Sequence, residues 1–167
     1  MFAHNGNLNN LGQSRLQPSG RYQPVGTTDS ELAFCLLLSR VSVLEHAPRQ
    51  LPALQLRLDA VAAMAEELRS FGPSSFLYAD GDLLFVHADR RLQPLTGQVS
   101  APALYRLACP ADVPPMLLDD SHRAVSGTAQ RVLLLASVPL TDEVWKPMSQ
   151  GELMAVRNGE IVAALTI

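Results

Sequence analysis

The sequence contains little of what several common protein classes need, beginning with cysteine and charge. Cys35 and Cys109 are its only cysteines, and no metal-ligand spacing surrounds them. Two isolated cysteines make neither a disulfide framework nor a zinc motif, so neither scaffold is expected. Charged residues make up 17% of the chain, and the formal net charge is −3. Because a nucleic-acid-binding surface needs a basic stripe, this balance argues against a nucleic-acid partner.

Long apolar runs are also absent, although 47% of the residues are hydrophobic. The longest run, Leu32 to Leu38, ends at Ser39-Arg40 and falls far short of the ~20 residues that cross a bilayer. The N-terminus lacks the basic segment and apolar segment of a secretory leader. We therefore expect a cytoplasmic protein without a membrane partner. Its length suits a single domain over residues 1–167.

A polar stretch lies close to the start of the chain, Phe2-Ala3-His4-Asn5-Gly6-Asn7-Leu8. Asn-Gly is the strongest short hairpin signal when alternating apolar runs flank it on both sides. Here the following residues are rich in turn formers and show no strand alternation. We interpret Asn5-Gly6 as the end of a buried strand that leads into a functional loop, with a hairpin as the alternative.

A second stretch, Gly26-Thr27-Thr28-Asp29-Ser30-Glu31, indicates a loop that opens a helix. Thr28 and Glu31 have capping-box spacing, with a hydroxyl at the cap and an acid three residues on. An acid at Asp29 would be stabilised by the helix dipole alone. A helix start also holds a side chain rigidly enough to aim it at a ligand. The two stretches could therefore bring neutral donors and a carboxylate to one pocket, as amide cleavage requires.

These two stretches, FAHNGNL and PVGTTDSELAF, resemble the glutaminase domain of class II glutamine amidotransferases, which are N-terminal-nucleophile hydrolases. The small stand-alone members are the most similar. The likeness continues through LLLASVPLTDEVW and GELMAVRNGEIV, so it covers most of the chain. It implies an α+β fold, specifically a four-layer αββα sandwich that is incomplete at the N-terminus.

The resemblance also implies roles for individual residues. Asn5 matches the side-chain amide donor of the oxyanion hole, and Gly6 matches its backbone N–H donor. Asp29 matches the carboxylate that binds the α-amino group of glutamine, and Thr28 supports that geometry. His4 matches a position beside the donor pair, to which we assign no catalytic role.

One departure from the family pattern concerns the nucleophile. The family uses a cysteine that becomes the mature N-terminus, whereas position 2 here is Phe2. The family segment that holds the substrate carboxylate through an arginine precedes the Asn-Gly strand and has no counterpart in this sequence. Cys35 lies in an apolar helix and Cys109 at a strand end, and neither has the accessible, electropositive setting of a reactive thiol.

Two helices are expected after the second stretch. The first should run from about Ser30 to about Ala47, because Pro48 disfavours helix in its predecessor. The second should run from about Leu51 to about Ser70, with charged residues such as Arg57 on a solvated face.

Strands should dominate the rest of the chain, and this order of elements is compatible with an α+β architecture. Asp80-Gly81 and Asn158-Gly159 each lie between apolar runs and predict hairpins. Residues 104–109 predict a strand, and residues 131–137 predict a strand buried on both faces. Residues 92–102 are interpreted as a linker.

The sequence therefore predicts a glutamine amidotransferase type 2 domain, truncated at its first strands and inactive alone. Its substrate would be glutamine, and no cofactor is predicted. No metal site is predicted either, and His87 is expected to be packed or solvated and not a metal ligand. A hydrolase of γ-glutamyl amides and a non-catalytic remnant that binds a ligand or partner are the alternatives. Strand edges left open by the missing part would lower stability and favour self-association.

Overall fold

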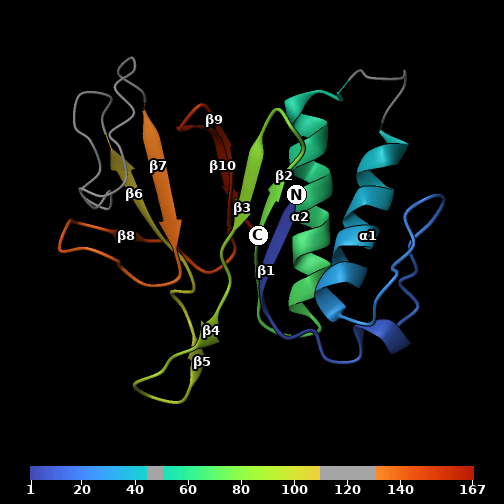
Figure 1. Ribbon diagram of the computed structural model, residues 1–167, viewed down its shortest axis with the longest axis horizontal. Helices are drawn as coiled ribbons and strands as arrows, with labels where there is room; N and C mark the ends of the chain where they lie inside the picture. The colour runs from blue at the N-terminus through green and yellow to red at the C-terminus, as the bar shows by residue number, and fades with distance from the viewer. Residues whose placement is uncertain (45–50, 110–130) are drawn as a thin grey trace.

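The computed structural model describes residues 1–44, 51–109 and 131–167. Two helices lie on one face of a five-stranded sheet, and a three-stranded sheet lies on its other side (Figure 1). The helices are α1 (Asp29–Val43) and α2 (Leu54–Arg69), preceded by the short 3-10 turn η1 (Leu11–Gln13). This arrangement confirms the α+β class.

The larger sheet is antiparallel throughout and has the strand order β1-β2-β3-β9-β10. Its strands are β1 (Phe2–Gly6), β2 (Ser74–Ala79), β3 (Leu84–His87), β9 (Glu152–Arg157) and β10 (Glu160–Thr166). The smaller sheet has the order β7-β6-β8, formed by β6 (Tyr105–Cys109), β7 (Val132–Ala136) and β8 (Lys146–Pro147). A short ribbon of β4 (Arg91–Leu92) and β5 (Val99–Ser100) connects the two sheets along the chain.

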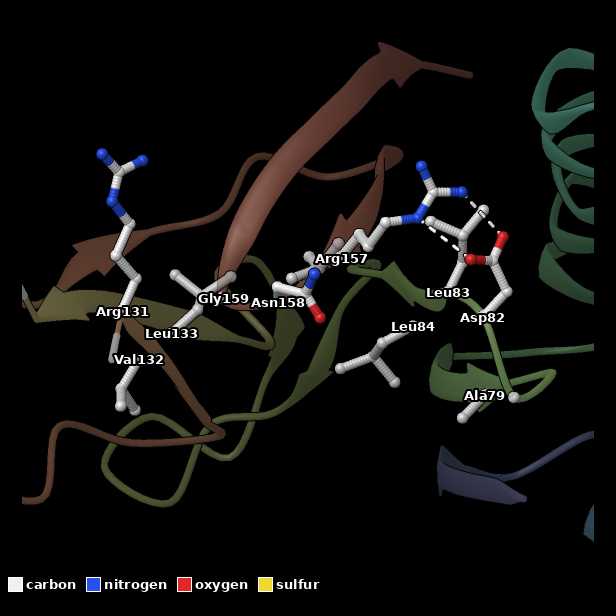
Figure 2. Close-up of a pocket in the computed structure, with 12 residues that line it drawn as sticks. Ala79, Asp82, Leu83, Leu84, Arg131, Val132, Leu133, Arg157, Asn158 and Gly159 are labelled. Atoms are coloured by element: carbon white, nitrogen blue, oxygen red, sulfur yellow. Dashed lines mark hydrogen bonds and ion pairs between the residues drawn. The ribbon is translucent and has the colours of Figure 1, made fainter. Parts of the chain in front are cut away.

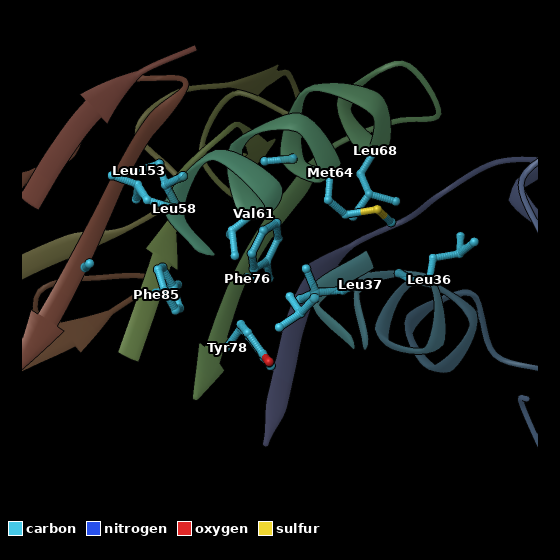
Figure 3. Packing of buried hydrophobic residues seen from close by; sticks show 14 of the residues in the cluster. Leu36, Leu37, Leu58, Val61, Met64, Leu68, Phe76, Tyr78, Phe85 and Leu153 are labelled. Atoms are coloured by element: carbon cyan, nitrogen blue, oxygen red, sulfur yellow. The ribbon is translucent and has the colours of Figure 1, made fainter. Parts of the chain in front are cut away.

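The larger sheet divides the core in two. On its helix side, Phe76 and Phe85 pack among Leu37, Met64 and other residues of α1 and α2 (Figure 3). On its other side, residues one position away in the strands, such as Val86 and Met154, form a smaller apolar cluster with Leu104 and Met148. Alternate residues of a strand point to opposite faces, so β3 and β9 are buried on both. The described residues thus form three layers, helices, sheet and sheet, of the four that the resemblance implies.

The helix expectations were correct in position and partly wrong in detail. Helix α1 has Thr28 as its N-cap and ends at Val43, and the last part of the expected helix, residues 45–47, lies outside the described residues. Helix α2 begins only at Leu54, later than the expected start near Leu51. Within the part of the chain that the structure describes, neither helix combines the length and apolar character needed to cross a membrane.

Both predicted hairpins are confirmed, and two strand expectations need correction. The β2–β3 hairpin turns at Asp80-Gly81, and the β9–β10 hairpin turns at Asn158-Gly159. Residues 92–102 were expected to be a linker, but they contain the last residue of β4 and the whole of β5, which pair with each other. Strand β7 was expected to be buried on both faces, yet all five of its residues are partly exposed. Its position at the edge of the smaller sheet accounts for this exposure.

Arg57 is the clearest correction to the expected solvated face of α2. Its side chain is 4% exposed and pairs with the carboxylates of Asp80 at 2.7 Å and Asp82 at 2.8 Å. Asp82 also accepts two hydrogen bonds from Arg157 at the end of β9, at 3.0 and 2.7 Å. These ion pairs tie the first turn of α2 to the β2–β3 turn. A charge on a helix was therefore buried because a hairpin turn supplied its partners.

Replacing Asp80 should reveal the contribution of this buried pair. Asp80→Ala removes the more buried of the two carboxylates that pair with Arg57 and the acceptor for the backbone N–H groups of Asp82 and Leu83. We expect the free energy of unfolding in urea to fall by about 2–4 kcal/mol, because the buried cation keeps only Asp82 and two backbone donors lose their acceptor. Glu67→Ala, which breaks the more exposed pair with Arg40, should cost less than about 1 kcal/mol. Equal losses in the two variants would contradict this assignment.

Candidate functional site

The Asn5-Gly6 pair lies at the end of β1, as the sequence predicted, but β1 is a partly exposed edge strand and not the buried strand that was expected. Asn7 N–H donates to Pro73 O at 3.2 Å, and Ala79 N–H donates to Met1 O at 2.9 Å. Hydrogen-bonded and non-hydrogen-bonded pairs alternate along an antiparallel ladder. The bonds of β1 to β2 therefore fall on its odd-numbered residues, and the N–H of Gly6 points away from β2. On that side β1 has no strand neighbour among the described residues, so this N–H is available to a ligand.

Close packing requires glycine at position 6. A Cβ built there would lie 1.9 Å from the carbonyl oxygen of Pro73 and 2.8 Å from Nε2 of His4. Backbone cannot give way as a flexible side chain can. The strand therefore approaches the residue before β2 more closely than any other amino acid would allow.

Asp29 joins the end of β1 to the start of α1. Its Oδ2 accepts the N–H of Leu8 at 2.8 Å, and its Oδ1 accepts the N–H of Ser30 at 2.8 Å. The side chain of Thr28 caps the helix by accepting the N–H of Glu31 at 3.2 Å. Glu31 does not complete a capping box; its carboxylate instead accepts the N–H groups of Val25 and Gly26. The two stretches singled out in the sequence thus meet in space.

Three of the four predicted site residues line cavities, and they line two cavities, not one; Gly6 lines neither. Thr28 and Asp29 line a cavity of about 320 Å³ together with Leu8 and the η1 segment. Asn5 lines a smaller cavity of about 120 Å³ with Leu77 and Leu104, on the side of the second sheet. The Asn5 amide makes no hydrogen bond with a described residue. The structure therefore brings Asp29 to the loop that follows Gly6 but does not place it against Asn5.

Buried polar residues gather beneath this end of the sheet, and the sequence reasoning missed most of them. Asp89 is fully buried and accepts the N–H of Ser74 at 3.1 Å and an Nε2–H of Gln150 at 3.1 Å. Arg69 of α2 pairs with the same carboxylate at 3.3 Å. The available signal was the pair His87 and Asp89, two residues apart at the end of an apolar strand. Such a cluster fixes the start of β2, on which Gly6 rests.

His87 itself is buried and held neutral. Its Nδ1–H donates to Ser74 O at 2.7 Å, and Nε2 has no hydrogen-bond partner among the described residues. Burial lowers the pKa of His87 to about 4, although the bond to Ser74 and the charge of Asp89 oppose this shift. The expectation of a packed or solvated histidine is thereby resolved in favour of packing.

The two cysteines are poorly placed for chemistry. Burial raises the pKa of both thiols, and the nearby carboxylates of Glu31 and Glu143 raise the pKa of Cys35 and Cys109 respectively. Neither thiol lines the cavities of Asn5 or Asp29. Among the described residues, no group of three or more histidine, cysteine or acidic side chains is placed to hold a metal ion.

A cavity of about 460 Å³ lies at the other end of the sandwich (Figure 2). It is lined by the β2–β3 turn, the β9–β10 turn and the start of β7, and by none of the predicted site residues. Its charged side chains are already paired, Asp82 with Arg157 and Arg131 with Glu160. These pairings leave little to recognise a charged ligand, so the chemistry points to the Asn5 end instead.

Comparison with known proteins identifies the family of the chain. A family model described as class-II glutamine amidotransferases matches residues 1–167. The chain is 32% identical over 162 residues to "Putative glutamine amidotransferase YafJ" of Escherichia coli, covering 96% of this chain and 59% of that protein. It is also 32% identical over 162 residues to an uncharacterized protein of Methanocaldococcus jannaschii, and this match covers 96% of this chain and 42% of that protein.

A solved structure is similar in both sequence and fold. The crystal structure of a predicted glutamine amidotransferase from Pseudomonas aeruginosa PA01 superposes with a TM-score of 0.73 at 32% identity. The match covers 97% of this chain and 59% of that one. The chain spans about half the length of the curated relatives it matches.

Substituting Gly6 tests the close approach at the end of β1. Gly6→Ala should lower the free energy of unfolding by about 1–3 kcal/mol, because its Cβ overlaps the carbonyl of Pro73. Gly12→Ala is the matched control, since the nearest atom to its Cβ, in Leu32, lies 3.9 Å away. Urea unfolding measures both. A Gly6→Ala chain as stable as the Gly12→Ala chain would show that the strand can move aside.

Buried His87 should make the fold sensitive to acid. Its pKa is about 4 in the folded chain and near 6.5 when unfolded, so the unfolded state binds the proton first as pH falls. Its contribution to stability is complete above pH 6.5 and should shrink by roughly 3 kcal/mol by pH 4. His87→Asn keeps a donor for Ser74 and does not titrate. Urea unfolding from pH 7.5 to 4 should therefore show the two chains converging; parallel curves would contradict the shift.

Proposed function

Because this chain belongs to the class II glutamine amidotransferase family, we propose that it forms the oxyanion and amine-binding half of a glutamine site. In this proposal the N–H of Gly6 and the side-chain amide of Asn5 stabilise the oxyanion that forms when the glutamine amide is attacked. The carboxylate of Asp29, supported by Thr28, binds the α-amino group.

The observation that carries the proposal is the direction of the Gly6 N–H. It leaves the sheet at the open side of β1, beside an Asn5 amide that has no hydrogen-bond partner among the described residues. Two unpaired neutral donors on adjacent residues are what a developing oxyanion requires. Asp29 supports the same interpretation, because its carboxylate is fixed 2.8 Å from the N–H of Leu8, two residues after Gly6.

The nucleophile in this proposal is a cysteine outside these 167 residues. Cys35 and Cys109 are buried, with pKa values raised by that burial. The expected chemistry is attack on the side-chain amide, collapse of the oxyanion with release of ammonia to water or to an acceptor, and hydrolysis of the acyl-enzyme to glutamate. The chain alone should therefore bind glutamine without hydrolysing it.

Calorimetric titration of the chain with glutamine tests this proposal. We expect weak, saturable binding that Asp29→Asn weakens about tenfold or more, because a charge-assisted hydrogen bond to the amine is lost. Glu31→Gln is the matched control: it removes the same charge from the same helical turn, where Glu31 holds only backbone N–H groups. For the glutamine analogue that lacks the α-amino group, Asp29→Asn should change little.

Two outcomes would overturn the proposal. One is the absence of saturable glutamine binding at any concentration tested. The other is ammonia release by the chain that Cys35→Ser or Cys109→Ser abolishes, which would place the nucleophile inside it. Tighter binding of a γ-glutamyl peptide than of glutamine would favour a γ-glutamyl amide hydrolase on the same scaffold.

A further inference from the structure

A chain of hydrogen bonds links the strand that carries Asn5-Gly6 to the helix that carries Asp29. Nδ1 of His4 lies 2.9 Å from Oγ of Ser30, and that hydroxyl lies 3.4 Å from Oδ1 of Asp29. A carboxylate only accepts hydrogen bonds, so a Ser30 hydroxyl that donates to Asp29 must accept from His4. That arrangement puts the proton of the neutral imidazole on Nδ1, whereas a hydroxyl that donates to His4 would put it on Nε2.

The same carboxylate also holds the residues on the other side of the donor pair. Oδ2 of Asp29 accepts the N–H of Leu8 at 2.8 Å. His4 immediately precedes Asn5, and Leu8 follows Gly6 by two positions. One carboxylate therefore fixes the donor pair from both sides, directly through Leu8 and indirectly through Ser30 and His4.

The imidazole of His4 also packs against Gly6, on the face of β1 that is turned toward α1. Its Nε2 would lie 2.8 Å from a Cβ at position 6, and it is buried with no hydrogen-bond partner among the described residues. Phe2, two residues earlier on the same face of β1, stacks on Phe34 of α1 with a ring separation of 5.3 Å. His4 therefore lies in the layer between the sheet and α1.

Resting on the function proposed above, we infer that His4 is a positioning residue whose bond to Ser30 holds the Asn5-Gly6 donors at a fixed place relative to Asp29. His4 borders the same cavity as Asn5, but its imidazole faces α1, where Nδ1 meets Ser30, while the side chain of Asn5, one residue along the strand, faces the second sheet. It acts through the strand, by setting where Gly6 presents its N–H. Burial lowers the pKa of His4, and Asp29 partly opposes that shift, so the neutral form persists at physiological pH.

Paired variants separate the hydrogen bond from simple packing. Ser30→Ala removes the hydroxyl, and Ser30→Thr keeps it. His4→Asn places an amide nitrogen where Nδ1 was, and His4→Gln places it where Nε2 was. We expect Ser30→Ala and His4→Gln to weaken glutamine binding about fivefold, as the loss of one hydrogen bond implies. Ser30→Thr and His4→Asn should stay within about twofold of the parent chain on the same basis.

Two readouts do not depend on glutamine. Long-range ¹H–¹⁵N spectra of the parent chain should show His4 with its proton on Nδ1, and Ser30→Ala should mix the two tautomers. Hydrogen exchange at the Leu8 amide should become about fivefold faster in Ser30→Ala and His4→Gln. The free energy of unfolding of these two variants should fall no further than that of Ser30→Thr and His4→Asn.

The outcomes distinguish the two proposals. A parent chain that binds no glutamine yet shows the Nδ1–H tautomer and the paired exchange pattern would refute the proposed function and support the role of His4. A proton on Nε2, or His4→Asn and His4→Gln variants with equal effects, would overturn the positioning role whatever the chain binds.

Discussion

The carboxylate of Asp29 is the contact on which the candidate site depends. It accepts N–H groups from Leu8 and from Ser30, residues that belong to different elements. The connection over residues 7–28, whose only regular element is the short η1 turn, separates β1 from α1, and a connection of that length does not by itself fix where its ends lie. The hydrogen bonds of Asp29, together with the Thr28 cap, replace that freedom with a defined geometry. A charged group at a helix start, favoured there by the dipole, thus also determines where the strand end lies.

The sequence predicted the elements of this fold better than their environments. Local signals such as Thr28 at a helix cap and the Asn158-Gly159 turn act within a few residues, so they survive without tertiary information. Arg57 shows the limit, because its burial depends on Asp80 and Asp82, which lie on a turn more than twenty positions away. Periodicity reports which face of a helix is apolar, but not which carboxylates another segment will bring to it.

In the candidate site, too, local motifs were visible in the sequence and contacts between distant segments were not. Asn5, Gly6, Thr28 and Asp29 were singled out because each belongs to a compact motif, and the two motifs do meet. Apart from the His87 and Asp89 pair, the polar layer beneath them gave no local signal, since its members come from β1, β2 and β3 and from both helices. His4, Ser74 and His87 each leave a buried side-chain atom without a hydrogen-bond partner in the described structure. Buried polar atoms without a hydrogen-bond partner destabilise the folded state, and they are found most often near functional sites, where core packing departs from the ordinary pattern.

The open side of β1 joins stability to function in this chain. An edge strand with outward N–H groups invites pairing with another chain, which most proteins prevent with charge, proline or a cover. Strand β1 carries no charged side chain apart from a protonatable histidine whose pKa is lowered, and it contains no proline. In the proposed site, the direction that makes the Gly6 N–H vulnerable to pairing is also the direction that would make it available to an oxyanion. A segment that covered this edge would then have to leave that donor free.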